Sequence, residues 1–478
     1  MRTYLYVVFT LFIVGAWGLG NAQTVASLQV RENPHSTLSA LVSLEVLGAL
    51  EGAEVSVRYE TEGEPAGETP SYPVEEGVQE IAVLGLLPET TYDLSVHVDG
   101  AGAEARSRLE FTTGSLPEPL QDLTVETTGD ADGYTLVETF LGPKFAFAFD
   151  GEGRIRWYKS FEDEPALFET KLHPHGNYTT FVGISYGFQA TDGQFVEYTP
   201  GGEEVATYQA NGPLYTDSHE ILLTTDERGE VEHAHFFSYD LRRITEVPPV
   251  GGEVGTRTAG HQLLRQTPEG KIDFYWNAWD HFEVADWVAP RGSPEYQDFD
   301  HPNSLDFDRD GNYIVSMRSF DAVLKLNAKT GDLLWQLGGR KNQFEFVDDP
   351  LGGFSAQHTA YITDEGNVLV FDNGMTHHPP RSRAVEYELD LEAMTATMVW
   401  EFRPDPPLYS PIVSSAERFE NGHTLVGFGV PSRMFEVSGA GDTVWEASIT
   451  RPDDEGEPQA VPFYRANRLP SLYEFREP

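Results

Sequence analysis

Short hydrophobic runs separated by turn-forming residues extend through the chain from about residue 23 onward. Over 23–117 the runs are rich in Val, Leu and Thr, as in VSLEVLGAL, QEIAVLGL and TYDLSVHV, and clusters of Gly, Pro and Glu separate them. Short β-branched runs with turn signals between them are typical of β-strands. We therefore predict a small antiparallel β-sandwich over 23–117. The Pro-containing segment 115–119 is predicted to be a linker.

Beyond the linker, two patterns alternate along the chain. One is a strand, a Gly-containing turn and a second strand, as in DRDGNYIVSMRS and DEGNVLVFDNG. The other is a turn followed by a strand with Trp or Tyr, as in TGDLLWQLGG and GDTVWEAS. Each pair supplies about four strands at a period of about 40 to 60 residues, which is typical of propeller blades. Five blades are predicted over 167–212, 213–280, 300–340, 356–405 and 413–450.

A sixth blade is predicted to combine segments from both ends of this region. Residues 134–160 supply most of its strands, and the segment FYRANRLPSLY, which begins at Phe463, closes the ring. Such closure removes the exposed strand edges that a long all-β chain would otherwise present. The predicted fold class is therefore all-β, with a six-bladed β-propeller over 118–478 after the sandwich, and seven blades is the alternative.

The first 22 residues have the pattern of a secretory signal peptide. A basic residue, Arg2, precedes an apolar run that ends in Gly20-Asn21-Ala22. We expect Sec-type export with cleavage after Ala22, and a periplasmic or secreted protein. An uncleaved signal anchor is the alternative. Every later apolar stretch is interrupted by Asp, Glu, Gly or Pro, so no membrane span is predicted in the mature chain.

The composition is strongly acidic, with 32 Lys and Arg against 77 Asp and Glu and a formal net charge of −45. Such a surface repels nucleic acid and anionic lipid, which argues against both as partners. An acidic shell suits a salt-rich, halophilic setting where counterions screen the self-repulsion, and a cation-binding surface is the alternative. The chain has no cysteine, which excludes disulfides, thiolate metal sites and a cysteine nucleophile. A homo-oligomer stays possible on this composition.

Histidine is the strongest candidate for chemistry, because the chain has no cysteine to serve as a nucleophile. His219, His301 and His358 begin predicted blades at equivalent places. Since the innermost strand of each blade lines the central channel, we expect these three side chains to converge at one mouth of it. Arg318, in SMRSF, adds a positive charge there. Three imidazoles could instead bind zinc or copper, but the arginine favours an anion, so no metal or other cofactor is predicted.

Other basic residues give weaker signals. His378 and Arg383 follow the DNG turn at 372–374 and are predicted to shape the acceptor side of the channel mouth. The alternative is a loop whose arginines pair with the acidic surface. His173 and His175 flank a predicted blade turn and are expected at the surface. The tryptophans of the blade strands are expected mainly to pack in the core.

Longer stretches of the chain resemble known families. The run DFDHPNSLDFDRDGNYIVSMRSFDAVLKLNAKTGDLLWQLGG, followed by FSAQHTAYITDEGNVLVFDNG and RSRAVEYELD, resembles the bacterial arylsulfotransferases, which use aryl sulfates directly as donors. The resemblance covers roughly 120–478 and includes Asp-x-x-His-x-Asn-Ser, Ser-x-Arg, Gln-His-Thr and Asp-Asn-Gly elements in the family's order. Separately, LLPETTY at 86–92 resembles the tyrosine corner of a fibronectin type III domain, with Tyr92 tying its strand to the preceding loop.

The arylsulfotransferase resemblance implies a role for each matching residue. His358 resembles the histidine that is transiently sulfurylated, and His219 resembles another active-site histidine. His301 and Arg318 resemble the pair that grips the sulfate. The chain departs from the family in a shorter stretch between Arg318 and His358 and in lacking a cysteine pair that some members use. The predicted substrate contacts are Asn303, Gln357, His378 and Arg383.

The implied reaction moves a sulfuryl group from an aryl sulfate donor to a phenolic acceptor by a ping-pong mechanism through a sulfohistidine. A neutral imidazole is a nucleophile near pH 7, and fixed donors such as Arg318 must hold the anionic group in transfer. No basic nucleotide-binding loop is evident, which argues against an adenylyl-sulfate donor. Two alternatives stay open: a non-catalytic propeller that binds a ligand or partner at the cell surface, and a quinone-cofactor dehydrogenase propeller.

Overall fold

The computed structural model of the protein describes residues 24–47, 52–99, 105–139, 142–183, 193–211, 214–244, 255–288, 291–293 and 296–473. The signal peptide predicted over 1–22 lies outside these residues. Strands make up almost all of the regular structure that is described, and the helices are at most four residues long. In the same residues, no helix has the length and hydropathy that a membrane crossing requires. The fold is all-β.

The N-terminal strands form two sheets around a shared hydrophobic core. Alternate residues of β7 (Thr91–Asp99), from Tyr92 to Val98, are buried because one face of this strand faces that core. The Tyr92 hydroxyl accepts a hydrogen bond from the Leu87 N–H at 2.9 Å, which ties β7 to the preceding loop. One sheet contains β1 (Thr24–Asn33), β2 (Ser36–Leu47) and β6 (Gly77–Val83), and the other contains β7, β3 (Glu54–Glu60), β4 (Gly67–Glu68), β5 (Tyr72–Pro73) and β8 (Ala105–Thr112).

Six further sheets follow α1 (Glu118–Gln121) in the described part of the chain. Each has four main strands, and these lie in the predicted blade ranges, except that β35 extends to Pro452 beyond the predicted end at 450. Additional edge strands are β9 (Thr124–Gly129), β21 (Arg291–Ser293), β22 (Tyr296–Asp298), β27 (Glu345–Val347) and β36 (Pro458–Ala460). The main strands are β10 (Tyr134–Thr139), β11 (Phe145–Asp150), β12 (Ile155–Ser160) with β37 (Phe463–Leu469); β13 (Leu167–Leu172), β14 (Tyr178–Val182), β15 (Gln194–Tyr198), β16 (Glu204–Tyr208); β17 (Thr216–Thr225), β18 (Val231–Arg243), β19 (Arg257–Gln266), β20 (Ile272–Asn277); β23 (Pro302–Phe307), β24 (Tyr313–Met317), β25 (Ala322–Leu326), β26 (Leu333–Gly338); β28 (His358–Ile362), β29 (Val368–Asp372), β30 (Arg383–Asp390), β31 (Thr395–Phe402); and β32 (Ser415–Arg418), β33 (Thr424–Phe428), β34 (Arg433–Val437), β35 (Thr443–Pro452).

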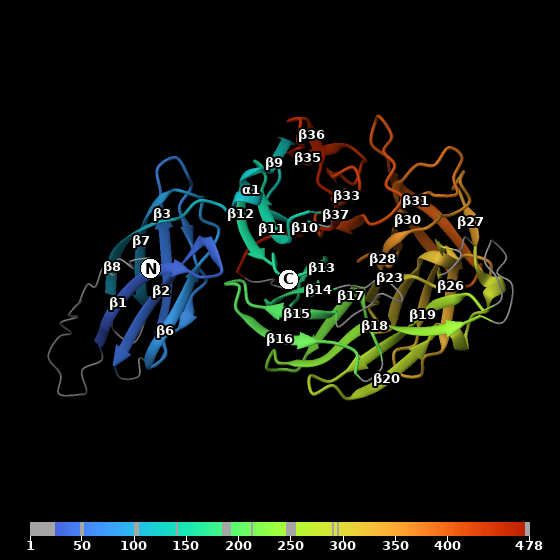
Figure 1. Ribbon diagram of the computed structural model, residues 1–478, viewed down its shortest axis with the longest axis horizontal. Coiled ribbons are helices and arrows are strands. Elements are labelled where there is room, and N and C mark those ends of the chain that lie inside the picture. The colour runs from blue at the N-terminus through green and yellow to red at the C-terminus, as the bar shows by residue number, and fades with distance from the viewer. Residues whose placement is uncertain are drawn as a thin grey trace.

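The innermost strands of these sheets make a closed ring. They contact one another in the order β37, β13, β17, β23, β28 and β32, and β32 in turn contacts β37. Figure 1 shows them around the middle of the larger part of the molecule. The last strand, β37, pairs with β10, with Leu469 opposite Tyr134, and β9 pairs with β35 at the outer side of the neighbouring sheet. The sheets therefore form a β-propeller whose ring is closed twice by strands from opposite ends of the region.

The hairpin between β23 and β24 follows directly from the Asp-x-Asp-Gly-Asn pattern at 308–312. Between β23 and β24, Asp308 Oδ1 accepts hydrogen bonds from the backbone N–H groups of Asp310 at 3.0 Å and Asn312 at 2.8 Å. Gly311 takes φ of +73°, a backbone conformation that costs glycine little. The side chain of the first Asp thus stabilises a tight turn between two buried strands.

The sandwich lies on the side of β12, the outer strand of its sheet, which contacts β2 (Figure 1). Arg154 Nη1 forms an ion pair with Glu64 Oε1 at 2.6 Å, and Arg156 Nε donates to the carbonyl oxygen of Gly85 at 2.8 Å. Leu38 of β2 and Leu84 are also buried in hydrophobic clusters of the larger part, so polar and apolar contacts join the two parts of the chain.

Candidate active site

Three histidines from three sheets lie together where the innermost strands begin. His219 lies near the start of β17, His301 directly precedes β23, and His358 is the first residue of β28. The ring centroids of His219 and His301 are 4.6 Å apart, and those of His301 and His358 are 6.3 Å apart. Tyr464, from β37, lies 5.9 Å from His219 and 6.5 Å from His358 by the same measure. The closed ring therefore brings residues far apart in sequence into one cluster.

The backbone around this cluster departs from regular pairing. The register of β17 with β18 shifts between Thr216 and Ile221, so the segment that carries His219 bulges from the sheet. Similar shifts occur after Pro302 in β23 and after His358 in β28. His301 itself has φ of +49°, which is uncommon for a residue with a side chain. Bulges and left-handed residues of this kind re-aim side chains, and they are frequent at functional sites.

Arg318 places a fixed positive charge beside the histidines. It begins the short helix η4 (Arg318–Phe320) directly after β24, and its N–H donates to the carbonyl oxygen of His301 at 3.0 Å. Its guanidinium is buried and donates through Nη2 to the carbonyl oxygen of Pro411 at 3.0 Å. The charge acts on its neighbours: together with burial, it lowers the pKa of both His301 and His358.

The hydrogen bonds of His358 fix its tautomer. Asn373 donates through Nδ2 to the carbonyl oxygens of Ser410 at 2.7 Å and Val413 at 3.1 Å, so its Oδ1 faces His358 Nδ1 at 2.7 Å. His358 Nδ1 must therefore carry the hydrogen, and Nε2 accepts from the Val413 N–H at 3.2 Å. Burial first, and then Arg318, hold the pKa of His358 well below its usual range. The ring is a neutral imidazole with a lone pair on Nε2.

The other two histidines each pair with an aspartate through Nδ1. His219 Nδ1 lies 2.8 Å from Asp217 Oδ1, and His301 Nδ1 contacts Asp298 Oδ2. Burial lowers the pKa of His301 to about 4, even though Asp298 acts in the opposite direction. Burial alone would raise the pKa of Asp217, but His219 and the neighbouring His261 bring it well below its usual range. With Nδ1 engaged, Nε2 is the ring nitrogen left for a substrate.

Asn303 and Gln357, two of the predicted substrate contacts, are fully buried next to the cluster. Asn303 Nδ2 donates to the carbonyl oxygen of Gln357 at 2.7 Å, which links β23 to the start of β28. Gln357 Nε2 donates to Ser316 Oγ and to the carbonyl oxygen of Ala322, both at 3.0 Å. Within the described residues Asn303 Oδ1 is buried without a hydrogen-bond partner. Gln357 Oε1 is likewise buried without a hydrogen-bond partner there, so both amides link neighbouring strands through their nitrogens and keep an acceptor oxygen.

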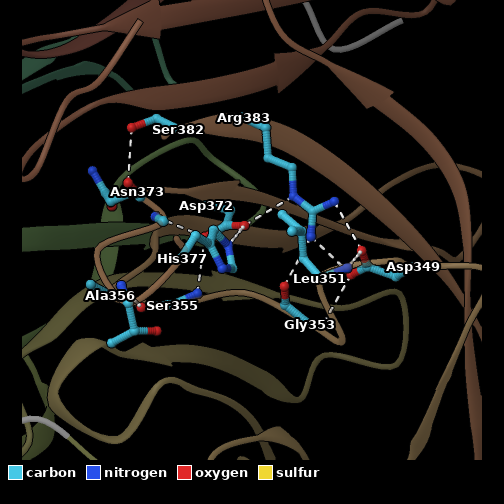
Figure 2. A network of polar contacts seen from close by, with 12 residues as sticks. Asp349, Leu351, Gly353, Ser355, Ala356, Asp372, Asn373, His377, Ser382 and Arg383 are labelled. Atoms are coloured by element: carbon cyan, nitrogen blue, oxygen red, sulfur yellow. Dashed lines mark hydrogen bonds and ion pairs between the residues drawn. The ribbon is translucent and has the colours of Figure 1, made fainter. Parts of the chain in front are cut away.

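Arg383 differs from its expected place at the channel mouth. Its side chain is 1 % exposed, and it forms ion pairs with Asp349 at 2.8 Å and Asp372 at 2.9 Å, as Figure 2 shows. Asp372 also contacts His377 Nε2 at 2.8 Å and accepts from the backbone N–H groups of Ser355 and Gly374, each at 2.9 Å. The guanidinium therefore joins the loops that precede His358 and follow Asn373, instead of facing a substrate. His378 is exposed in the second of these loops.

The expectation that His173 and His175 lie at the surface is wrong. His173 is 2 % exposed, and its Nε2 contacts Thr179 Oγ1 at 2.8 Å. His175 Nε2 contacts Glu197 Oε1 at 2.8 Å, and its side chain is 8 % exposed. Both rings fold back over the hairpin between β13 and β14, where they satisfy buried polar partners.

Sequence reasoning missed the contribution of the closing strand. Tyr464 completes the aromatic side of the cluster, and the neighbouring Arg465 is buried among Glu169 at 2.8 Å, Glu220 at 2.5 Å and the carbonyl oxygen of Asn303 at 2.5 Å. The segment FYRANRLPSLY was predicted only to close the ring. An innermost strand also lines the centre of a propeller, so the predicted position of this segment already implied that its side chains reach the cluster.

A group of three potential metal ligands lies behind the cluster. Donor atoms of His261, Asp298 and Asp300 are within 4.8 Å of one another. These side chains are already engaged, however: His261 Nδ1 lies 2.5 Å from Asp300 Oδ1, and Asp298 contacts His301. We assign no metal to this group, because its hydrogen bonds account for its arrangement.

These features define a β-propeller whose centre carries histidines and a buried arginine from separate sheets, an arrangement suited to an anionic group. The chain belongs to the arylsulfotransferase (ASST) family, because the sequence model of that family matches residues 121–459. The match includes the three histidines and Arg318, but not β37.

Individual relatives match over shorter stretches. The arylsulfate sulfotransferases AssT of Escherichia coli and of Lelliottia amnigena are each 36% identical over 91 residues, which is 17% of this chain. The match covers 15% of the length of each of these curated relatives. Among solved structures, a protein of unknown function from Bacteroides caccae has a TM-score of 0.42 at 12% identity and covers 70% of this chain and 98% of its own. A virginiamycin B lyase from Staphylococcus aureus has a TM-score of 0.35 at 10% identity and covers 71% of this chain and 88% of its own.

Proposed function

We propose that the protein is an aryl-sulfate sulfotransferase that moves a sulfuryl group from a phenolic sulfate ester to a phenolic acceptor through a sulfohistidine on His358. The observation that carries this proposal is the tautomer of His358, which leaves Nε2 without a hydrogen on a ring that lies 6.3 Å from the ring of His301 and close enough to Arg318 for that charge to lower its pKa. Membership of the arylsulfotransferase family supports the same chemistry. The chain is exported, and its sandwich over 23–117 precedes the catalytic propeller over 118–478.

In the first half-reaction, His358 Nε2 attacks the sulfur of the donor. The nitrogen–sulfur bond forms as the bond from sulfur to the aryl oxygen breaks, and the leaving oxygen takes a proton from Nε2 of His219. Asp217 stabilises His219 in its protonated form through the 2.8 Å contact at Nδ1. Asn373 keeps the hydrogen on His358 Nδ1 and stabilises the positive ring that forms.

In the second half-reaction, a phenol gives its proton to His219 Nε2 while its oxygen attacks the sulfur. The nitrogen–sulfur bond breaks, and His358 returns to the neutral imidazole. Throughout, Arg318 holds the sulfuryl oxygens, whose negative charge would otherwise be unfavourable in a protein of net charge −45. The Val413 N–H, released from Nε2, becomes a further donor to these oxygens.

The test is transfer from 4-nitrophenyl sulfate to phenol by the purified full chain, followed as nitrophenolate release. We expect acceptor-dependent release that disappears in His358→Gln and persists in His97→Gln, a matched change in the sandwich. With donor alone, quenched wild-type protein should carry a sulfuryl group on the peptide that contains His358. Absence of release with several phenols and salt concentrations would refute the proposal and favour a non-catalytic binding propeller.

A further inference from the structure

His261 lies one layer behind the histidine cluster and contacts the carboxylates that support it. It belongs to β19, and its ring is 3 % exposed. Its Nδ1 lies 2.5 Å from Asp300 Oδ1, and its backbone N–H donates to Asp300 Oδ2 at 3.0 Å. On the other side of the ring, Nε2 lies 3.5 Å from Asp217 Oδ2, an ion-pair contact that is longer than a hydrogen bond, and within the described residues that oxygen has no hydrogen-bond partner. Tyr239 packs against the ring with centroids 4.6 Å apart.

Each of these two carboxylates also holds one histidine of the cluster. Asp217 Oδ1 lies 2.8 Å from His219 Nδ1 and accepts the His219 N–H at 3.0 Å. Asp300 Oδ1 accepts the N–H of His301 at 2.9 Å, the residue with the left-handed backbone. A continuous chain of polar contacts therefore runs between the two histidines, and His261 is its centre.

The carboxylates on either side of the ring favour a protonated His261. Both ring nitrogens face a carboxylate oxygen, but a neutral imidazole has only one N–H to donate. Asp217 and Asp300 are both fully buried, and they would repel each other across an uncharged ring. Burial alone would lower the pKa of His261, yet the two aspartates outweigh it and raise the pKa well above its usual range.

We propose that His261 is a positioning residue that, as an imidazolium, bridges Asp217 and Asp300. Through these carboxylates it orients the ring of His219 and the strained backbone of His301. The inference rests on the proposed function, in which His219 passes a proton to and from the phenolic oxygen. Without the cation, Asp217 would bind a proton more readily and would lose its hold on the His219 Nδ1–H.

The first test needs no catalysis. In full-length protein labelled with 15N at histidine, His261 should give an imidazolium signal at pH 7, identified by its loss in His261→Gln. A neutral His261 signal at that pH would overturn the inference. So would a stoichiometric metal in the purified protein that His261→Gln removes, because His261 would then be a ligand.

The second test compares donors whose leaving groups differ in their need for a proton. The leaving oxygen of phenyl sulfate is basic, so its departure needs a proton from His219. The leaving oxygen of 4-nitrophenyl sulfate is much less basic and needs that proton much less. We expect His261→Gln to reduce kcat/KM for the donor, which reports the first half-reaction alone, roughly 100-fold with phenyl sulfate but less than about fivefold with 4-nitrophenyl sulfate. Equal losses with both donors would indicate a merely structural role and overturn the inference. The matched control is His235→Gln, which changes another buried histidine and should keep the wild-type donor ratio.

A double substitution provides the third readout. Since His261 acts through Asp217, the variant His261→Gln/Asp217→Asn should lose no more kcat than Asp217→Asn alone. Multiplicative losses would contradict the chain of contacts. If the wild type transfers no sulfuryl group while the imidazolium signal is present, the proposed function fails and the charge assignment stands, so the two failures are distinguishable.

Discussion

Arg383→Met removes the cation from the network that frames His358. Asp349 and Asp372 are both fully buried, and Arg383 pairs with them at 2.8 and 2.9 Å. Methionine fills much of the space but leaves two carboxylates without their counter-charge. Removing one partner of a buried ion pair costs about 3 to 5 kcal/mol. The unfolding entropy of the roughly 350 residues of the ring is about 0.7 kcal/mol per degree, so the melting temperature should fall by about 4 to 7 °C.

Thermal and urea denaturation of the full chain, followed by tryptophan fluorescence, measure this loss. The matched control is Arg228→Met, which removes an arginine whose side chain is 72% exposed and whose partners are Asp226 and Glu230. Exposed pairs of this kind contribute about 0 to 1 kcal/mol, so the control should melt close to the wild type. An Arg383→Met variant that melts within about 1 °C of the wild type would refute the reasoning.

Three further predictions concern the histidines. Arg318→Met should lower kcat/KM about 100-fold, since a fixed donor to a developing oxyanion contributes about 3 kcal/mol. Because the arginine lowers the pKa of His358, its loss should also raise that pKa and move the acid limb of the kcat/KM profile to higher pH. An acid limb that stays in place would contradict this prediction. Asn373→Leu should lower kcat at least about tenfold with little change in KM, because His358 loses the acceptor that fixes its tautomer; equal effects on both constants would count against this. Burial lowers the pKa of His235 from 6.5 to about 3, so the unfolded chain binds a proton more readily than the folded protein. The free energy of unfolding therefore decreases as pH falls through that window, by up to about 1.4 kcal/mol per pH unit. Urea titrations between about pH 6 and 4 should show a shallower pH dependence for His235→Gln than for the wild type, and identical slopes would refute the assignment.

The strand content and the order of the sheets were predictable because local chemistry sets them. The DGN turn at 310–312 marks a hairpin through backbone requirements that neighbouring residues satisfy, as Asp308 does here. Three equivalent strand starts then predicted that His219, His301 and His358 lie together, since a ring of sheets turns equal positions into neighbours.

The remaining features depend on contacts between distant segments. Arg383 looks like a surface residue in sequence, and only the fold brings Asp349 and Asp372 around it. Asp217 is only two residues from His219, so this contact is local in sequence. The position of His261 next to Asp217 depends instead on the pairing of β18 with β19. The burial of His173 also depends on the fold, because a residue beside a hairpin turn can face a neighbouring strand as well as solvent.

Closure of the ring by β37 has a consequence for the order in which the site is assembled. During synthesis the chain carries His219, His301 and His358 well before Phe463 is added, but without β37 the inner ring has a gap beside β13 and β32. Tyr464 and Arg465 arrive only with that last strand. The cluster is therefore complete only once the last strand has closed the ring.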